Sequence, residues 1–190
     1  MTNDKAGGAR PDFCFSRAIH IKPGWLSNLK ITGLLLDIDN TITRWEQRIV
    51  PDAELHWLNT LKDQGISLLL LSNGLAGKKA QVIAQSGLEH VSGYPVKPLP
   101  AAFRQGLIDL QLPANQVMMV GDSIFTDIIP ANRLGIWTAL VEPLGQVDFP
   151  GTKLYRLLEQ LLRLRRPLNP AHDFRQLNEN GEISSSTPAS

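Results

Sequence analysis

A largely apolar segment, ITGLLL at residues 31–36, runs directly into two aspartates that are one residue apart, Asp37 and Asp39. A segment that is apolar on both faces is typical of a central strand in a parallel sheet, because helices cover both sides of such a sheet. Residues i and i+2 of an extended chain point to the same face, so the two carboxylates would lie close together. Like charges at that distance repel, and the sequence therefore predicts either a raised carboxyl pKa or a cation between them.

Short apolar segments and amphipathic segments go on alternating as far as residue 141. Further strands are predicted at 66–72, 116–120 and 136–141, with at most a short strand in HVSG between the first two. Helices are predicted from Pro51 to a stop at Gly65, over 77–87, over 100–110, and in a segment that ends at Gly135. This order predicts an α/β fold, a three-layer Rossmann-like parallel sheet with helices on both faces.

Length and composition fit one domain of this kind. The chain has 190 residues, of which 43% are hydrophobic, enough for one sizeable core. We expect a polar lead-in over residues 1–30, a domain over 31–166 that ends in a basic amphipathic helix at 152–166, and a disordered tail over 167–190. The tail is rich in Ser, Pro and Asn, which cannot form a packed core.

Charge, cysteine content and hydropathy narrow the classes of function. The formal net charge of +1 indicates no nucleic-acid partner, and the single cysteine, Cys14, excludes an internal disulfide and fits a reducing compartment. No apolar stretch approaches the roughly 20 residues of a membrane-spanning helix, and the N-terminal segment lacks the apolar core of a signal peptide. We therefore expect a cytoplasmic protein, with any membrane contact peripheral and at the inner face.

Acidic residues also follow the predicted strand 116–120, namely Asp122 and, five positions later, Asp127. The first and fourth strands of an open parallel sheet are often neighbours, so up to four carboxylates would meet at the carboxyl edge, where ligands bind. Together with Asp37 and Asp39, these residues predict a hard divalent cation with oxygen ligands, which is Mg²⁺ when phosphate oxygens complete its shell.

Complementary groups follow the other strands. Ser72 and Asn73 end the second predicted strand, just ahead of a helix start whose N–H groups favour an anion. Lys97, in VKPLP, would offer a point charge to a phosphoryl oxygen. Each residue taken singly is also explained by a turn, a cap or a solvated side chain, so the argument rests on their order at successive strand ends. The combination predicts a phosphoryl-transfer site.

Two other interpretations of the aspartates fit less well. An EF-hand loop also begins with D-x-D, but Ile42 stands where that loop requires glycine. A response-regulator receiver shares the α/β layout, but it needs an acceptor Asp after the third strand, where this chain has HVSG, and a Lys after the fifth, where it has Glu142. A non-enzymatic phospho-acceptor module is therefore the least favoured class.

Four motifs carry a family resemblance. DIDNT at 37–41, the LLLLSN strand end at Ser72, Lys97 and GDSIFTD at 121–127 resemble the four successive motifs of the haloacid dehalogenase (HAD) superfamily of phosphatases. The resemblance covers roughly residues 31–141. The combination of DNT, SN, KP, GD, FTD and NRLG followed by PL is similar to the YqeG-like subfamily of type IIIA, which includes phosphatidylglycerophosphate phosphatases.

The resemblance implies a role for each residue. Asp37 would be the nucleophile that forms an aspartyl-phosphate, Asp39 the general acid and base, and Lys97 would offset charge on the phosphate and on Asp37. Phosphoryl oxygens would be bound, and the loop around them oriented, by Ser72, Asn73, Lys97 and Thr41. Mg²⁺ would be held by Asp37, by the backbone carbonyl of Asp39, by Asp122 and, directly or through water, by Asp127.

The spacing of the motifs leaves no room for a cap domain. From position 37 to 72 is 72 − 37 = 35 residues and from 72 to 97 is 97 − 72 = 25, and the predicted elements fill both gaps. Capless members of the superfamily generally act on bulky or membrane-presented substrates, because the substrate must help to exclude water. Phosphatidylglycerophosphate is therefore the expected substrate, with a soluble sugar phosphate or nucleotide as the alternative. Two positions depart from the subfamily pattern: Gly74 stands where Asn is frequent and Pro130 where Gly is frequent, and neither position has a catalytic role.

Two further features bear on the substrate. Arg44 and Trp45, just past the aspartates, are candidate contacts to a lipid head group, while Trp45 fits a packing role equally well. The segment KLYRLLEQLLRLRR, 153–166, contains five basic residues and a single acidic one, Glu159. Its leucines fall on one stripe of a helix. Such a helix fits either contact with an anionic bilayer or packing of its leucine face on the sheet.

Overall fold

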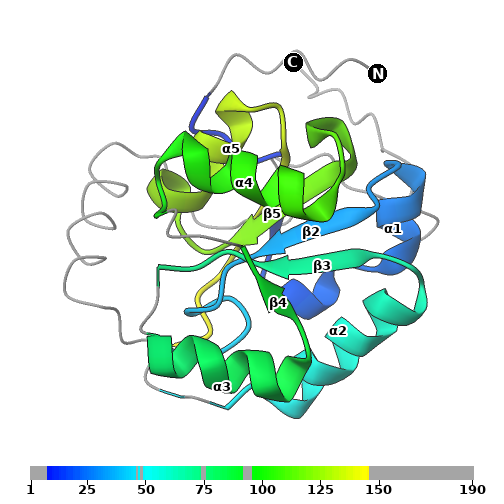
Figure 1. Ribbon diagram of the computed structural model, residues 1–190. Coiled ribbons are helices and arrows are strands. Elements are labelled where there is room, and N and C mark those ends of the chain that lie inside the picture. The colour runs from blue at the N-terminus through cyan, green and yellow to red at the C-terminus, as the bar shows by residue number, and fades with distance from the viewer. Residues whose placement is uncertain (1–7, 46, 48, 74–75, 92–95, 146–190) are drawn as a thin grey trace, which may run out of the picture.

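Six parallel strands form a single sheet in the order β1-β6-β5-β2-β3-β4. The computed structural model describes residues 8–45, 47, 49–73, 76–91 and 96–145 (Figure 1). The strands are β1 (Phe13–Phe15), β2 (Gly33–Leu36), β3 (Ser67–Leu70), β4 (Glu89–His90), β5 (Val117–Gly121) and β6 (Trp137–Val141). The predicted α/β architecture is confirmed, and in the described part of the chain no cap domain is inserted between the strands.

Helices cover both faces of the sheet. They are α1 (Pro23–Asn28), α2 (Asp52–Asp63), α3 (Ala76–Ser86), α4 (Pro100–Leu110) and α5 (Ile129–Arg133). Figure 1 shows α4 and α5 on one side of the strands and α2 and α3 on the other. The segment predicted as one helix ending at Gly135 is a π-helical turn, Ile124–Ile128, followed by α5. None of the described helices is both long and apolar enough to cross a bilayer.

Alternation along β2 divides the core into two layers. Leu34 and Leu36 pack in one hydrophobic cluster with Leu58 of α2, whereas Leu35 packs on the opposite face with Phe103 of α4. All three leucines are fully buried, as expected for a strand that helices cover on both sides. The central strand that carries the aspartates is therefore held from both faces.

Glycines end two of the helices where the sequence predicts it. Gly65 follows α2 with φ of +77° and Gly87 follows α3 with φ of +62°. Both values lie in the left-handed region, which glycine adopts without a steric penalty from Cβ. Each helix therefore stops in time for the chain to enter the next strand at the amino edge of the sheet.

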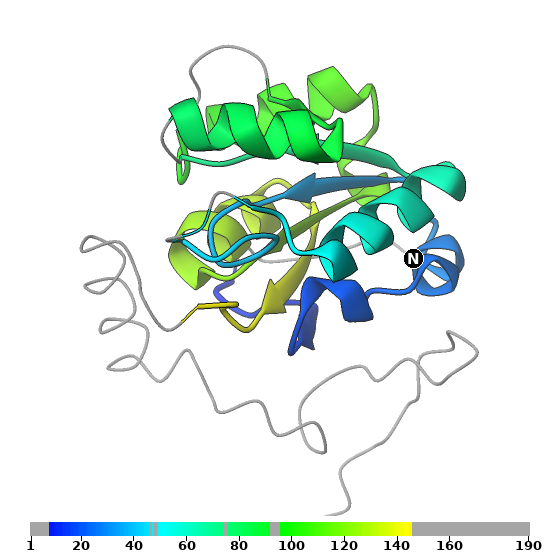
Figure 2. The same cartoon turned by 90° about the horizontal axis from the view of Figure 1, so that it is seen from below.

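The segment before residue 31, which the sequence predicts to be a lead-in ahead of the domain, contributes to the sheet and core. Strand β1 pairs with β6, with Phe13 opposite Ala139, and Figure 2 shows β1 in blue beside β6 in yellow. The carboxylate of Asp12 accepts a hydrogen bond of 2.8 Å from the Thr138 N–H. Leu26 of α1 is buried in the same cluster as α2. The helix predicted at 152–166 and the tail at 167–190 lie outside the described residues.

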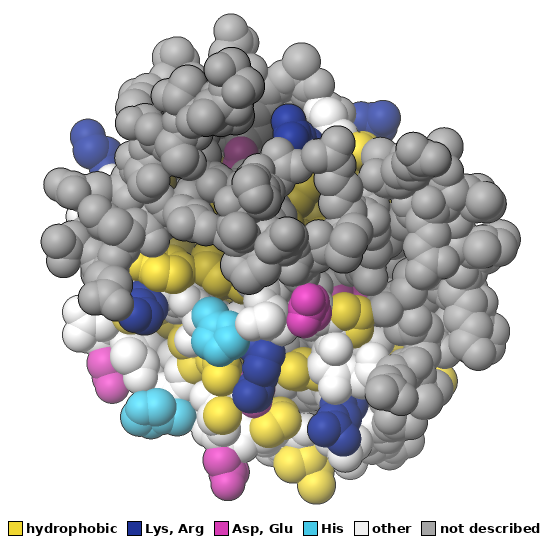
Figure 3. Space-filling view, turned by 180° about the vertical axis from the view of Figure 1, so that it is seen from behind, with side chains coloured by type: hydrophobic (Ala, Val, Ile, Leu, Met, Phe, Trp, Pro, Cys, Tyr) yellow, Lys and Arg dark blue, Asp and Glu magenta, His cyan; other side chains and the backbone are white. Residues whose placement is uncertain are grey.

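The sheet order brings the predicted functional positions to one edge. Strand β2 lies between β5 and β3, so the residues that follow these three strands meet at the carboxyl edge. The predicted pairing of the strand at 31–36 with the strand at 116–120 is thereby confirmed. On the face seen in Figure 3, the described side chains mix basic, acidic and hydrophobic types.

Candidate active site

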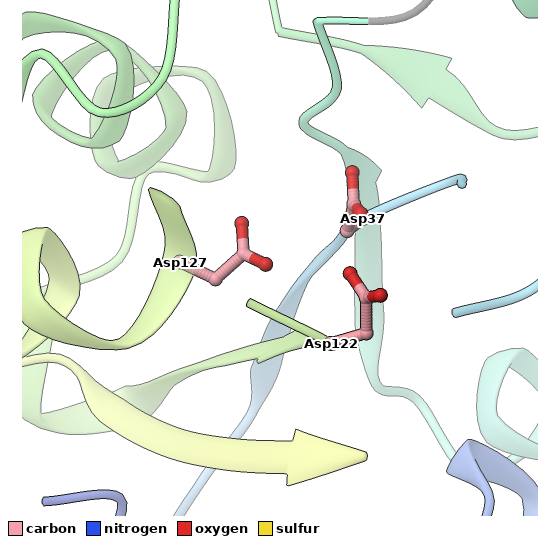
Figure 4. A group of neighbouring side chains, drawn as sticks. All are labelled: Asp37, Asp122 and Asp127. Carbon is pink, nitrogen blue, oxygen red and sulfur yellow. The ribbon is translucent and has the colours of Figure 1, made fainter. Parts of the chain in front are cut away.

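Three buried aspartates converge at the carboxyl edge of the sheet. Asp37 follows β2, Asp122 follows β5, and Asp127 lies in the π-helical turn beyond it. One carboxylate oxygen of each lies within 4.8 Å of the others. Figure 4 shows the three side chains next to one another. Their exposed fractions are 6%, 5% and 0%, respectively. Three acids that are distant in sequence therefore share one small, dry volume.

Lys97 forms a bridge between two of these carboxylates. Its Nζ donates to Asp37 Oδ1 at 2.7 Å and to Asp127 Oδ1 at 2.6 Å. Burial by itself would lower the pKa of Lys97, but the carboxylates of Asp127 and Asp37 outweigh that effect and raise the pKa above its usual value. The lysine is therefore a charged and well-oriented cation.

The environment of Asp37 disfavours its ionised form. Burial, the largest effect, raises the pKa of Asp37 from 3.8 to about 7; Lys97 opposes this rise, while the charges of Asp127 and Asp39 add to it. One lysine cannot balance three carboxylates, so the cluster has excess negative charge. Oxygen ligands in this number, without thiol or imidazole, suit a hard divalent cation. The residues present therefore fit a metal site.

Close packing aims the carboxylate of Asp127. The Ser123 N–H donates to Asp127 Oδ2 at 3.1 Å, and the Ser123 hydroxyl accepts from the Thr126 N–H and so caps the turn. The backbone of Gly121 lies against the same side chain: a Cβ added there would be 2.8 Å from the Cβ of Asp127. No side chain larger than hydrogen fits at position 121 unless Asp127 moves.

The loop after β2 is held by its own hydrogen bonds. Asn40 has φ of +61°, and its backbone N–H donates to the carbonyl of Thr43 at 2.7 Å. The side chain of Asn40 accepts from the Trp45 N–H at 3.1 Å. Thr41 is buried, and its hydroxyl has no hydrogen-bond partner in the described part of the chain. Asn40 therefore shapes the loop, a role that was not predicted from the sequence. The tolerance of asparagine for positive φ was the signal that could have indicated it.

The predicted residues divide into those that contact one another and those that lie nearby. Contacts join Asp37 and Asp127 through Lys97, with Asp122 in the same cluster. Asp39 is half-buried and lies outside this cluster of three carboxylates, while Arg44 is exposed and Trp45 half-buried on the loop. Ser72, at the end of β3, is buried.

Asn73 has an unexpected partner. Its Nδ2 donates to the carbonyl of Lys97 at 2.7 Å, and its Oδ1 accepts from the Lys97 N–H at 2.8 Å. The family resemblance implies that this side chain binds the phosphoryl group, whereas in the structure it is bonded to the backbone of Lys97.

A second lysine lies within electrostatic reach of the site. Lys79 is half-buried on α3. Burial is the main cause that lowers its pKa; the positive charge of Lys97 adds to the effect, and the carboxylates of Asp39 and Asp37 oppose it. No described residue forms a hydrogen bond or ion pair with Lys79. Lys79 was not among the predicted site residues. The one feature of the sequence that pointed to it was its place one turn into the helix that follows Ser72.

We predict that Asp37→Asn stabilises the metal-free protein at high pH. The folded state raises the pKa of Asp37 from 3.8 to about 7, so it binds the proton more tightly than the unfolded chain, and stability falls as pH rises through that window. Asparagine removes this cost while keeping the shape. Urea unfolding in EDTA should show a gain on the order of 3 kcal/mol at pH 8, shrinking towards pH 4.

The control for this prediction is Asp63→Asn, which changes an exposed carboxylate on α2. Solvent screens that group, so the control should show no comparable gain. A wild-type protein that is more stable than Asp37→Asn at pH 8 would contradict the assignment of a strained carboxylate.

Comparison with known proteins identifies a family of hydrolases and relatives that are named as phosphatases. The family of haloacid dehalogenase-like hydrolases matches residues 41–135. The probable phosphatase YqeG of Bacillus subtilis (strain 168) is 26% identical over 151 residues, which cover 79% of this chain and 87% of that protein.

Two further proteins are similar to part of this chain. The ribulose-1,5-bisphosphate 5-phosphatase of Halopiger xanaduensis is 28% identical over 111 residues, 54% of this chain and 46% of that protein, so this chain spans less than half of that relative. The crystal structure of the HAD-hydrolase YfnB from Bacillus subtilis superposes with a TM-score of 0.46 and 15% identity over 67% of this chain and 98% of that one.

The family match spans half of the chain and runs from the loop after β2 to just past α5, a region that holds Lys97 and two of the three clustered aspartates, Asp122 and Asp127. This chain therefore belongs to the haloacid dehalogenase-like hydrolases.

Proposed function

We propose that this hydrolase is a Mg²⁺-dependent phosphomonoesterase that works through an aspartyl-phosphate on Asp37. The observation that carries the proposal is the bridge from Lys97 to Asp37 and Asp127 beside a third buried carboxylate, Asp122. Phosphoryl transfer needs little covalent chemistry from the protein beyond the nucleophile, and depends mainly on positioning and charge neutralisation. This site supplies both. The names of the two relatives, both phosphatases, add support.

The reaction proceeds in two steps. A carboxylate oxygen of Asp37 attacks phosphorus, the bond from phosphorus to the ester oxygen breaks, and Asp39 donates a proton to the leaving alkoxide. In the second step Asp39 takes a proton from water, the resulting hydroxide attacks phosphorus, and the bond to Asp37 breaks to release inorganic phosphate. Lys97, held at 2.7 Å from Asp37, stabilises the negative charge on the phosphoryl oxygens in the transition state of each step.

Mg²⁺ would be held by Asp37, Asp122 and Asp127, with the backbone carbonyl of Asp39 as a further ligand suggested by the family resemblance. When bound, it would polarise the phosphoryl group and neutralise its charge. The excess negative charge of the cluster supports this assignment.

We propose phosphatidylglycerophosphate as the substrate, on the resemblance to the YqeG-like subfamily and the absence of a cap domain in the described part of the chain. The alternative is a soluble sugar phosphate or nucleotide, which the name of the Halopiger relative favours. Phosphatidylglycerophosphate and a sugar bisphosphate, the kind of substrate named for the Halopiger relative, share one property: the scissile phosphomonoester belongs to a molecule with a second phosphate group. Lys79, half-buried near the site, is suited to that second charge.

Contact with an anionic membrane is part of this proposal. Arg44 is exposed on the loop beside the site and could meet a head group. The basic segment 152–166 lies outside the described residues, so its part in membrane contact stays a prediction from the sequence.

A substrate panel tests the proposal. Phosphatidylglycerophosphate in detergent micelles should be hydrolysed with a higher kcat/KM than soluble sugar phosphates or nucleotides, and only with Mg²⁺.

Asp37→Asn should abolish turnover, and Asp39→Asn should slow it by about a hundredfold to ten-thousandfold. Preference for a soluble ester would overturn the lipid assignment, and turnover by Asp37→Asn would overturn the nucleophile.

We predict that Lys79→Gln lowers kcat/KM by about fivefold for substrates with a second phosphate, because a screened charge pair contributes roughly 1 kcal/mol. The rate of hydrolysis of p-nitrophenyl phosphate, which has no second phosphate group, should stay within about twofold of wild type. Lys30→Gln, an exposed lysine that precedes β2 at the opposite edge of the sheet, is the matched control. An equal loss on both classes of substrate would mean that Lys79 serves the common chemistry instead.

We predict that Gly121→Ala removes most of the Mg²⁺-dependent activity. The added Cβ cannot be accommodated unless Asp127 moves, and this displacement breaks the 2.6 Å contact with Lys97. A Mg²⁺ titration should show weaker activation and a kcat at least about tenfold lower. Gly24→Ala, where no heavy atom lies within 4 Å of the added Cβ, is the matched control. Normal activation in Gly121→Ala would show that the position of Asp127 is unimportant.

A further inference from the structure

The side chain of Asn73 and the backbone of Lys97 form a two-bond clamp between distant parts of the chain. The amide donates from Nδ2 to the Lys97 carbonyl at 2.7 Å and accepts at Oδ1 from the Lys97 N–H at 2.8 Å. A side-chain amide presents a donor and an acceptor side by side, which matches the two polar groups of a single backbone residue. The clamp thus engages both polar atoms of the side chain.

The backbone of Lys97 has no other hydrogen-bond partner in the part of the chain that the structure describes. The next residue is Pro98, which has no N–H to offer. Lys97 belongs to a connection rather than to a helix or strand, since α4 begins only at Pro100. No regular secondary structure therefore holds the lysine backbone at the carboxyl end of β3, and Asn73 does so.

The position of the Lys97 backbone matters because its side chain has to meet two targets at once. Nζ lies 2.7 Å from one oxygen of Asp37 and 2.6 Å from one oxygen of Asp127, and the side chain is only 4% exposed. A lysine side chain has four rotatable bonds and loses about 2 kcal/mol of rotamer entropy when it is fixed. When the Lys97 backbone is held in place, fewer conformations of its side chain have to be excluded for Nζ to reach both carboxylates.

We propose that Asn73 is a positioning residue that acts through the backbone of Lys97, and that its side chain does not hold the phosphoryl group. The proposal rests on the phosphatase function proposed above. In a site of this kind, a displacement of about 1 Å can reduce the rate roughly a hundredfold. Loss of the clamp should therefore slow the chemical step and leave the affinity for phosphate nearly unchanged.

Kinetics of Asn73→Ala separate the two roles. We expect kcat to fall by about 10- to 100-fold, while KM and the Kd for inorganic phosphate change by less than about threefold. Gln116→Ala, which removes an amide bonded to Thr32 at the opposite edge of the sheet, is the control and should match wild type. A tenfold rise in KM and in the phosphate Kd at unchanged kcat would overturn the proposal and return Asn73 to the phosphoryl group.

A double variant tests whether Asn73 acts through Lys97. With p-nitrophenyl phosphate as an activated ester, Asn73→Ala should lower kcat no more than about twofold in a Lys97→Met background, because the group that it positions is absent. If the two losses multiply, Asn73 acts independently of the lysine and the proposal fails.

A readout that needs no turnover keeps the proposal separate from the proposed function. In the metal-free protein, the ammonium group of a lysine held between two buried carboxylates should exchange slowly and give a ¹H–¹⁵N correlation of its own. This signal should be absent in Lys97→Met, lost or broadened in Asn73→Ala, and retained in Gln116→Ala, while the backbone amide spectra show that all variants stay folded. A signal unchanged in Asn73→Ala would overturn the clamp, whereas loss of the signal in a protein that hydrolyses no phosphate ester would overturn only the function.

Discussion

The imbalance between three buried carboxylates and one buried lysine is the constraint on which this site depends. Lys97 contacts Asp37 and Asp127 but offsets only one of the negative charges. The remaining charge lies where water cannot stabilise it, and burial raises the pKa of Asp37 to about 7. Such a cluster is costly to the folded protein in isolation and favourable when a divalent cation and a phosphoryl group share it. Stability given up at a site of this kind is a common cost of reactivity.

The fold withstands this cost because the strands that deliver the acids are held on both faces. Leu34 and Leu36 pack against one layer of helices and Leu35 against the other, so the end of β2 has little freedom. Pairing of β2 with β5 then fixes Asp37 relative to Asp122 within the spacing of two neighbouring strands. The segment before residue 31 completes the edge of the same sheet through β1. A rigid frame of this kind keeps like charges close together even though they repel each other.

Much of the site could be predicted from local rules. The meeting of Asp37 with Asp122 follows from the usual order of strands in an open parallel sheet, whereas Asp39, predicted to join them, lies outside the cluster. Three features could not be predicted in this way. Strand β1 has only three residues and lies at an edge, so it has no periodic signal to detect. Asn73 contacts the backbone of a residue 24 positions away, and the place of Lys79 depends on how α3 lies against the sheet.

The sequence by itself determined the type and order of the main elements from β2 to β6 and the residues at the strand ends, because hydrophobic periodicity and turn chemistry are local properties of the chain. Only the tertiary structure decided which of those residues touch. The bridge from Lys97 spans 60 positions to Asp37 and 30 to Asp127, and the direction of the Asp127 carboxylate depends on a π-helical turn packed against Gly121. Hydrogen bonds and ion pairs act over about 3 Å, so they are set by the packing of whole elements, which no short stretch of sequence contains.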